Sequence, residues 1–184
     1  MRIISGKYAK RNLYTLKSQK TRPTSDKVKE SLFNALGQFF SGGNVLDLYG
    51  GSGALGIEAV SRGCHQAVIV DINYQAVEII RKNVALTKEP DRFSIYKMPS
   101  NVALKKLASD GQEFDLVFLD PPYAKQHIVS DMKKMLKLAL LGQDAIVVAE
   151  TDDETELGQV EGFKLMQEKH LGKTIVRFYR KENL

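Results

Sequence analysis

The sequence is poor in the residues that build covalent cross-links and metal centres. A single cysteine, Cys64, excludes an internal disulfide and provides no cysteine cluster for a metal. The three histidines, His65, His127 and His170, are scattered without the spacing of metal ligands. We interpret these four residues as structural and expect no metal site.

Long apolar runs are also lacking. No segment approaches the roughly 18 apolar residues that a membrane helix needs, and the first residues, MRIISGKYAKR, are charged where a signal peptide would be apolar. We therefore expect a cytoplasmic protein with no membrane partner. A length of 184 residues fits one domain of ordinary size, residues 1–184, with one substantial core.

Negative charge is scarce in the first part of the chain. Residues 1–40 contain nine lysines and arginines but only two acids, a net charge of +7, so the remaining 144 residues carry −2 of the total of +5. A concentrated basic segment favours a polyanion such as nucleic acid as the partner. The alternative is that these charged side chains only form a water-exposed surface without binding a partner.

From Asn44 onward, short apolar runs alternate with longer helical patterns, which is the rhythm of βαβ units. Near-continuous apolar strands separated by helices predict a parallel sheet covered on both faces. The expected strands are 45–49, 67–71, 93–97, 116–120 and 145–150, and the expected helices are 54–63, 74–87, 100–109 and 126–141.

Both ends of the chain depart from this rhythm. Residues 163–169 and 174–180 read as strands joined by a turn too short for anything but antiparallel pairing. At the start, residues 2–5 and 12–16 predict a small hairpin, and Ser25 or Thr24 caps a helix that ends near Gly37. The expected fold is α/β, a Rossmann-like, doubly wound, mostly parallel seven-stranded sheet with a C-terminal antiparallel hairpin. Residues 1–40 would form an extension packed on a core of residues 41–184.

A glycine-rich turn lies between the first strand and its helix, in VLDLYGGSGALGIEAV. Gly51, Gly53 and Gly56 fit G-x-G-x-x-G, and Asp71 ends the next strand, where an acid can bind ribose hydroxyls. Dinucleotide oxidoreductases and S-adenosylmethionine (SAM) methyltransferases share this arrangement. Asp47, four residues before Gly51, would repel a pyrophosphate but suits the positive charges of SAM, so it favours SAM.

Three motifs extend this reading to a family. LDLYGGSG resembles the first SAM-binding motif of class I methyltransferases, and DPPY at 120–123 resembles the motif of those that methylate amino nitrogens. The N-terminal RIISGKYAKRNL and RPTSDKVKESLFNAL are similar to those of the RsmD family, bacterial methyltransferases of the guanine N2 amino group in 16S ribosomal RNA. The resemblance covers nearly the whole chain and implies the class I methyltransferase fold and a substrate in 16S rRNA or the small ribosomal subunit, including an assembly intermediate.

The resemblance also implies which residues hold SAM. Pro99 stands where the family has an acid or polar residue near the adenine, so we expect the Met98 backbone and Ile72 to hold the adenine, with Ser100 or Asn101 as substitutes. The full expected cofactor set is Asp47, Tyr49, Gly51, Ser52, Gly53, Asp71, Ile72 and Met98.

The DPPY stretch has a chemical rationale for a poorly nucleophilic amine. The Asp120 carboxylate and the Pro121 carbonyl can accept the two amine hydrogens, while Pro121 and Pro122 stiffen the turn and remove competing N–H donors. Tyr123 would stack on the base. These four residues are the expected catalytic set.

Lys7, Lys10, Arg11 and Arg22 are the expected RNA contacts. Other targets stay open, namely adenine N6 in nucleic acid, a glutamine side chain in a protein, or RNA binding without catalysis. The sequence does not give the oligomeric state or the particular guanine.

Overall fold

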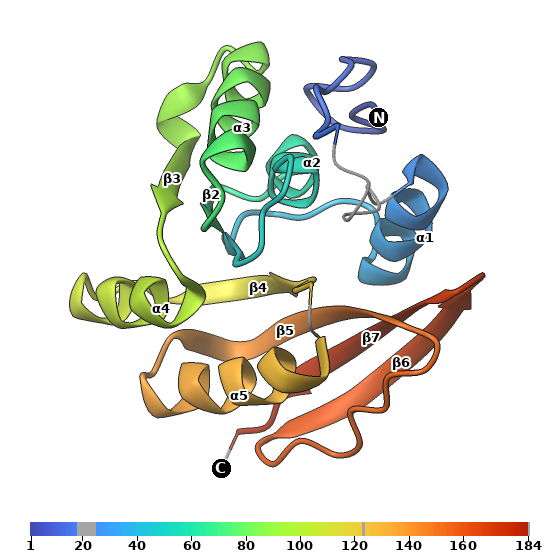
Figure 1. The fold of residues 1–184 in the computed structure, drawn as a ribbon, viewed down its shortest axis with the longest axis vertical. Coiled ribbons are helices and arrows are strands. Elements are labelled where there is room, and N and C mark those ends of the chain that lie inside the picture. Colours follow the sequence, from blue (N-terminus) through green and yellow to red (C-terminus); the bar gives the residue numbers. More distant parts are fainter. Residues whose placement is uncertain (18–24, 123, 184) are drawn as a thin grey trace.

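The computed structural model describes residues 1–17, 25–122 and 124–183. A seven-stranded sheet runs through the molecule in the order β3-β2-β1-β4-β5-β7-β6 (Figure 1). The first five strands are parallel, while β7 pairs antiparallel with both β5 and β6. The predicted seven-stranded, doubly wound sheet with a C-terminal antiparallel hairpin is confirmed. The strands are β1 (Asn44–Asp47), β2 (Gln66–Asp71), β3 (Phe93–Lys97), β4 (Phe114–Leu119), β5 (Leu141–Asp152), β6 (Phe163–Leu171) and β7 (Thr174–Lys181).

The helices cover the two faces of this sheet. Their bounds are α1 (Asp26–Leu36), α2 (Ala54–Ser61), α3 (Tyr74–Leu86), α4 (Ser100–Ser109) and α5 (Ala124–Lys137), with a short 3-10 turn at Pro90–Arg92. The first three helices share one apolar core with the sheet, and the last two share the core on the opposite face. Within the described ranges, no helix has the length and apolarity to cross a bilayer.

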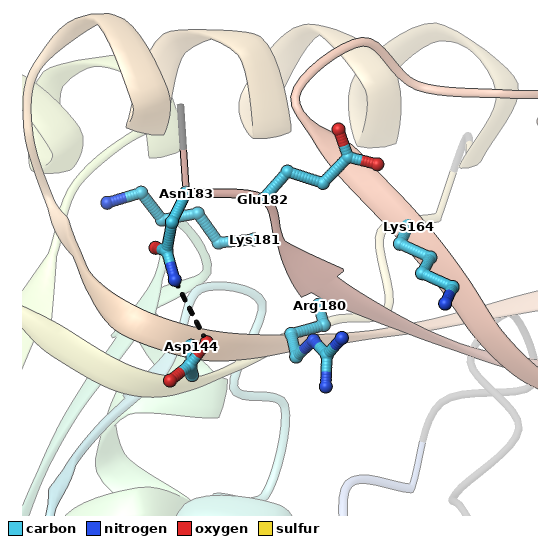
Figure 2. A pocket seen from close by; sticks show the side chains of 6 residues that line it. All are labelled: Asp144, Lys164, Arg180, Lys181, Glu182 and Asn183. Atoms are coloured by element: carbon cyan, nitrogen blue, oxygen red, sulfur yellow. Dashed lines mark hydrogen bonds between the residues drawn. The ribbon is translucent and has the colours of Figure 1, made fainter.

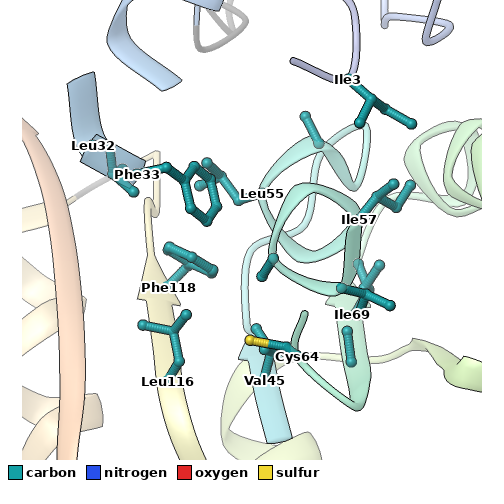
Figure 3. Packing of buried hydrophobic residues seen from close by; sticks show 14 of the residues in the cluster. Ile3, Leu32, Phe33, Val45, Leu55, Ile57, Cys64, Ile69, Leu116 and Phe118 are labelled. Carbon is teal, nitrogen blue, oxygen red and sulfur yellow. The ribbon is translucent and has the colours of Figure 1, made fainter. Parts of the chain in front are cut away.

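Alternation along each strand separates the two cores. Val45 faces the core below α1–α3, and its neighbour Leu46 faces the core below α4 and α5, as the two-residue period of a strand requires. Figure 3 shows Leu32 and Phe33 of α1 pointing into the first core, where the Phe33 and Phe118 rings lie 5.8 Å apart between centroids. Helix α1 is therefore built into the same core as the sheet.

Helix α1 follows the sequence prediction closely. The Ser25 hydroxyl accepts a hydrogen bond from the Val28 amide at 3.2 Å, which caps the helix start. Gly37, at φ +109°, ends the helix in the left-handed conformation that favours glycine. The helix also buries Lys29 completely, which the apolar pattern did not indicate.

The predicted N-terminal hairpin is present but shorter than expected. The structure has one isolated antiparallel bridge, Arg2 to Asn12, in place of two strands. The Ile3 amide donates to the Arg11 carbonyl at 2.9 Å and the Leu13 amide donates to the Met1 carbonyl at 2.8 Å, so the pairing is limited to the residues around this bridge. The Ile4 and Ser5 amides donate to the Glu58 carboxylate, and the Tyr8 amide donates to the Ser61 hydroxyl, both on α2.

Candidate active site

Three carboxylates converge at the carboxyl edge of the parallel sheet. Asp47 ends β1, where it lies in register with Ile69 of β2 and Phe118 of β4. Asp71 and Asp120 each stand two residues further along those neighbouring strands. The central strand therefore carries one acid, with a second and a third acid on its two sides.

The glycine-rich loop is fixed to this edge by its own backbone. The Gly51 amide donates to the Asp71 carboxylate at 2.9 Å, and the Gly56 amide donates to the Asp47 carboxylate at 3.2 Å. Gly50 lies so close to β2 that a Cβ there would be 2.5 Å from the Ile69 side chain, whereas a Cβ on Gly51, at φ +59°, would meet nothing within 4 Å. The loop is pressed against the sheet at Gly50 and open to a ligand at Gly51.

Burial and mutual repulsion change the acidity of these groups. The pKa of Asp47 is raised to about 7, mainly by removal from water; the hydrogen bond from the Gly56 amide acts against this rise, and the nearby carboxylates of Asp120 and Asp71 add to it. Removal from water also raises the pKa of Asp120. A ligand that brings positive charge to this edge would therefore be bound, and would stabilise the carboxylate forms.

The charges of these residues fit SAM and do not fit a dinucleotide. Three carboxylates around a glycine turn would repel a pyrophosphate, while sulfonium and ammonium groups would offset the carboxylate charge. The Asp71 carboxylate is oriented by the Gly51 and Asn73 amides, at 2.9 Å each. Its remaining lone pairs can accept from ribose hydroxyls. Asp47, Gly51, Ser52, Gly53 and Asp71 thus lie in one loop-and-edge cluster.

The region expected for adenine is apolar and open. Ile72 is 66% exposed immediately after β2, so its apolar side chain is accessible to a ligand. The Met98 amide donates to the Asp71 carbonyl at 3.1 Å, so Met98 keeps only its carbonyl and side chain for a ligand. Asn101 is exposed at the start of α4, next to Pro99 and Ser100.

A polar network that the sequence did not predict lies beside the glycine loop. The half-buried Tyr49 hydroxyl is bonded to the buried Asp131 carboxylate of α5 and to the Ser100 hydroxyl of α4, the latter at 3.1 Å. Desolvation raises the pKa of Asp131. Desolvation and the hydrogen bond to Asp131 raise the pKa of Tyr49. The network ties the loop to the helix that follows the DPPY turn. An isolated acid on α5 gave no sequence signal of this pairing.

The DPPY turn itself is described as far as Pro122. Asp120 directly follows β4 and Pro121 is buried, whereas Pro122 is exposed. Among the described residues, no hydrogen-bond donor is paired with the Asp120 carboxylate, so its oxygens can accept from a ligand. Tyr123 lies outside the described residues.

Two of the basic residues expected in the N-terminal segment contact the residues that follow α3. Lys7 pairs with Glu89 at 2.6 Å, and Arg11 donates to the Thr87 carbonyl at 3.3 Å. Lys10 is exposed at φ +72°. Arg22 lies outside the described residues.

A separate hollow lies at the opposite edge of the sheet. Figure 2 shows its lining around the end of β7 and the starts of β5 and β6. β5 starts at the edge where the parallel strands have their amino ends, whereas the glycine loop lies at their carboxyl ends. The hollow is therefore on the opposite edge and takes no part in the candidate site. Its lining residues are Asp144, Lys164, Arg180, Lys181, Glu182 and Asn183.

The strand order, the glycine loop and the acids at one edge define the class I methyltransferase fold. A solved Escherichia coli structure provisionally described as methyltransferase YhhF superposes with a TM-score of 0.86 at 28% identity, covering 100% of this chain and 99% of that one. A more distant methyltransferase, SMU.776, complexed with SAH, has a TM-score of 0.65 at 13% identity, covering 88% of this chain and 50% of that one, and shares the fold alone.

The family follows from the sequence relatives. A family model described as Conserved hypothetical protein 95 matches residues 1–180. Bacillus subtilis YlbH, provisionally named an rRNA methyltransferase, is 38% identical over 98% of this chain and 99% of its own length. Ribosomal RNA small subunit methyltransferase D of Escherichia coli K12 is 31% identical over 99% of this chain and 90% of its own. This chain belongs to the RsmD/YlbH family.

Proposed function

We propose that this protein transfers the methyl group of SAM to the exocyclic N2 amine of a loop guanine in 16S rRNA. The observation that carries the proposal is the Asp120 carboxylate at the carboxyl edge, next to Asp47 and followed at once by two prolines. The family supports it, since relatives are named small subunit rRNA methyltransferases. The reaction would take place in the cytoplasm on the small subunit or an assembly intermediate of it.

In the proposed mechanism the turn orients the amine. When bound, SAM would supply an electrophilic methyl group, and breaking its sulfur–methyl bond would leave S-adenosylhomocysteine. The Asp120 carboxylate and the Pro121 carbonyl accept the two amine hydrogens, which draws the nitrogen lone pair out of conjugation with the ring. The amine becomes acidic as it gains positive charge, so Asp120 can take the proton or pass it to water. Alignment of the reacting atoms can contribute ~7–11 kcal/mol toward the barrier.

The base must leave its stack to reach this edge. Pro122 and Tyr123 complete the proposed clamp, with the Tyr123 ring stacked on the guanine. Residues 1–40 serve as an RNA-binding extension of the catalytic core 41–184, and Lys7, Lys10, Arg11 and Arg22 hold phosphates. Tyr49, Ile72 and Met98 line the cofactor beside the glycine loop.

Product analysis tests the proposed function. Small subunits that lack this methylation are incubated with the protein and labelled SAM, then digested to nucleosides. N2-methylguanosine is the expected product. N6-methyladenosine would keep the chemistry but change the substrate, while labelled protein or the absence of transfer would contradict the proposal.

We expect SAM to bind more tightly as pH rises from about 6 to about 8. The SAM ammonium favours ionised Asp47, whose pKa of about 7 leaves it largely protonated below that pH in the free protein. Below that value, affinity should therefore rise up to ~10-fold per pH unit for one proton released. Calorimetry in buffers of different ionisation enthalpy measures both affinity and proton release. Asp47→Asn should reduce the slope, because only Asp120, whose pKa burial also raises to about 7, would then titrate at this edge. An affinity of the wild type that is independent of pH would contradict the assignment.

RNA affinity should fall steeply with salt. If about five basic residues contact phosphates, log K plotted against log salt has a slope of about −3.5, using ~0.7 per contact for single strands. Replacing the exposed Lys10 by alanine should reduce the slope by ~0.7. Lys164→Ala, an exposed lysine on the far edge strand β6, is the matched control. A flat dependence would exclude phosphate binding by the extension.

A further inference from the structure

Tyr14 is an exposed aromatic side chain on a firmly held piece of backbone. It is 53% exposed, whereas its neighbour Leu13 is buried at 6%. The other tyrosine of the N-terminal segment, Tyr8, is 2% exposed and its hydroxyl is bonded to Glu89. Tyr8 thus has a packing role, while the Tyr14 ring is left on the surface.

One buried side chain holds the Tyr14 backbone on both sides. Asn83 of α3 is fully buried, and its amide accepts from the Tyr14 N–H at 2.8 Å and donates to the Tyr14 carbonyl at 2.9 Å. The same Asn83 amide donates to the Ser52 carbonyl in the glycine-rich loop at 2.8 Å. A single residue therefore fixes the position of Tyr14 relative to the cofactor loop.

The charge around the ring is positive. The exposed Lys82, next to Asn83 on α3, places its ammonium 5.9 Å from the Tyr14 ring centroid. Lys17, three residues after Tyr14, is also exposed. An aromatic face with cations beside it matches a nucleotide, which brings a flat base and a negative phosphate together.

We propose that Tyr14 is a stacking platform for an unpaired nucleobase of the substrate RNA, one that neighbours the target base. This inference rests on the proposed function in one respect, that the substrate is RNA. The base must be unpaired, because a base within a duplex has no free face for a side chain to cover. Through Asn83, the platform holds the strand at a fixed offset from the glycine-rich loop, while Lys82 takes the adjoining phosphate.

The test measures RNA binding without catalysis. A short fluorescent single-stranded RNA with one guanine is titrated with the wild type, Tyr14→Ala, Tyr14→Phe and the control Leu165→Ala, whose exposed side chain lies on the edge strand β6. Tyr14→Ala should weaken binding by about 5- to 150-fold. Tyr14→Phe keeps the ring and should stay within about twofold of the wild type, as should Leu165→Ala.

Two further measurements separate stacking from other roles. The salt slope of Tyr14→Ala should equal that of the wild type, because the slope counts phosphate contacts only. Two further RNAs each lack one base, either just before or just after the guanine. If Tyr14 stacks on one of these bases, Tyr14→Ala and the wild type should bind the RNA that lacks it equally tightly. Unchanged binding by Tyr14→Ala, or equal loss against every abasic RNA, would overturn the inference.

The outcomes distinguish this inference from the proposed function. Binding is measured without SAM, so a protein that stacks RNA on Tyr14 but forms no N2-methylguanosine contradicts the proposed function alone. A protein that forms N2-methylguanosine equally well with Tyr14→Ala, at unchanged KM for RNA, contradicts the platform alone. Unchanged melting temperature and SAM affinity in Tyr14→Ala show that the variant is folded.

Discussion

Replacing Asp120 with alanine is expected to lower the rate of methyl transfer by ~10²–10⁴-fold without weakening SAM binding. The loss follows from removing the acceptor that orients the amine and receives its proton. SAM affinity should be equal or tighter near pH 7, because the Asp120 charge raises the pKa of Asp47 in the wild type. Without that charge, more Asp47 is ionised and available to the SAM ammonium. Single-turnover transfer and calorimetric binding of SAM measure the two effects separately.

A matched substitution checks that the effect belongs to the site. Asp110 follows α4 and pairs with Lys106 at 2.8 Å on the surface. Asp110→Ala removes the same chemical group and should leave transfer unchanged. A transfer rate in Asp120→Ala within about tenfold of the wild type would remove Asp120 from the mechanism, because a group that orients the amine and accepts its proton is expected to contribute at least ~10²-fold.

Replacing Glu58 with alanine is expected to destabilise the fold by ~3–5 kcal/mol, the range for breaking a buried ion pair. The Glu58 carboxylate is fully buried between two cations, Lys29 of α1 at 3.3 Å and Arg62 at 2.9 Å. It also accepts the Ile4 and Ser5 amides at 3.0 and 3.1 Å. The variant would leave two buried cations and two amides without this partner. Urea unfolding monitored by circular dichroism measures the loss.

Glu78→Ala is the matched control for this effect. Glu78 is also helical and pairs with Arg81 at 2.6 Å, but both side chains are substantially exposed. An exposed pair contributes ~0–1 kcal/mol, so this variant should remain close to the wild type.

Lys29 provides a second readout of Glu58→Ala. Burial lowers the pKa of Lys29, so the folded state binds its proton less readily than the unfolded state and stability rises with pH. Without Glu58 the pKa of Lys29 in the folded protein should be lower still, because the Glu58 charge raises it. Part of the lost stability should therefore return as the pH is raised. A loss below about 1 kcal/mol, or a loss that does not change with pH, would contradict the buried network.

The sequence indicated the fold because its strands and helices alternate with clear periods. The turn after Leu171 was too short for a parallel crossover, which is why the antiparallel hairpin of β6 and β7 could be predicted. Element ends were less certain. β5 begins at Leu141 and ends at Asp152, beyond the predicted 145–150, because pairing with β7 extends it at its outer end as far as Asp152.

The candidate site was partly readable for a similar reason. Asp47, Asp71 and Asp120 each end or follow an apolar run, and parallel strands deliver their carboxyl ends to one edge, so local position implied spatial proximity. The Tyr49 to Asp131 pairing was not readable, since the residues are 82 positions apart and share no motif.

The sequence by itself determined the order of the strands and helices, the glycine turn and the edge at which the acids meet. These features depend on periodicity and on neighbours within a few residues. Only the tertiary structure decided how the N-terminal segment is attached. Glu58 and Asn83 bind the segment's backbone across 53 to 69 positions and hold it on the core beside the short Arg2–Asn12 bridge. A buried polar side chain must find partners, but its own position in the chain does not say which backbone will supply them.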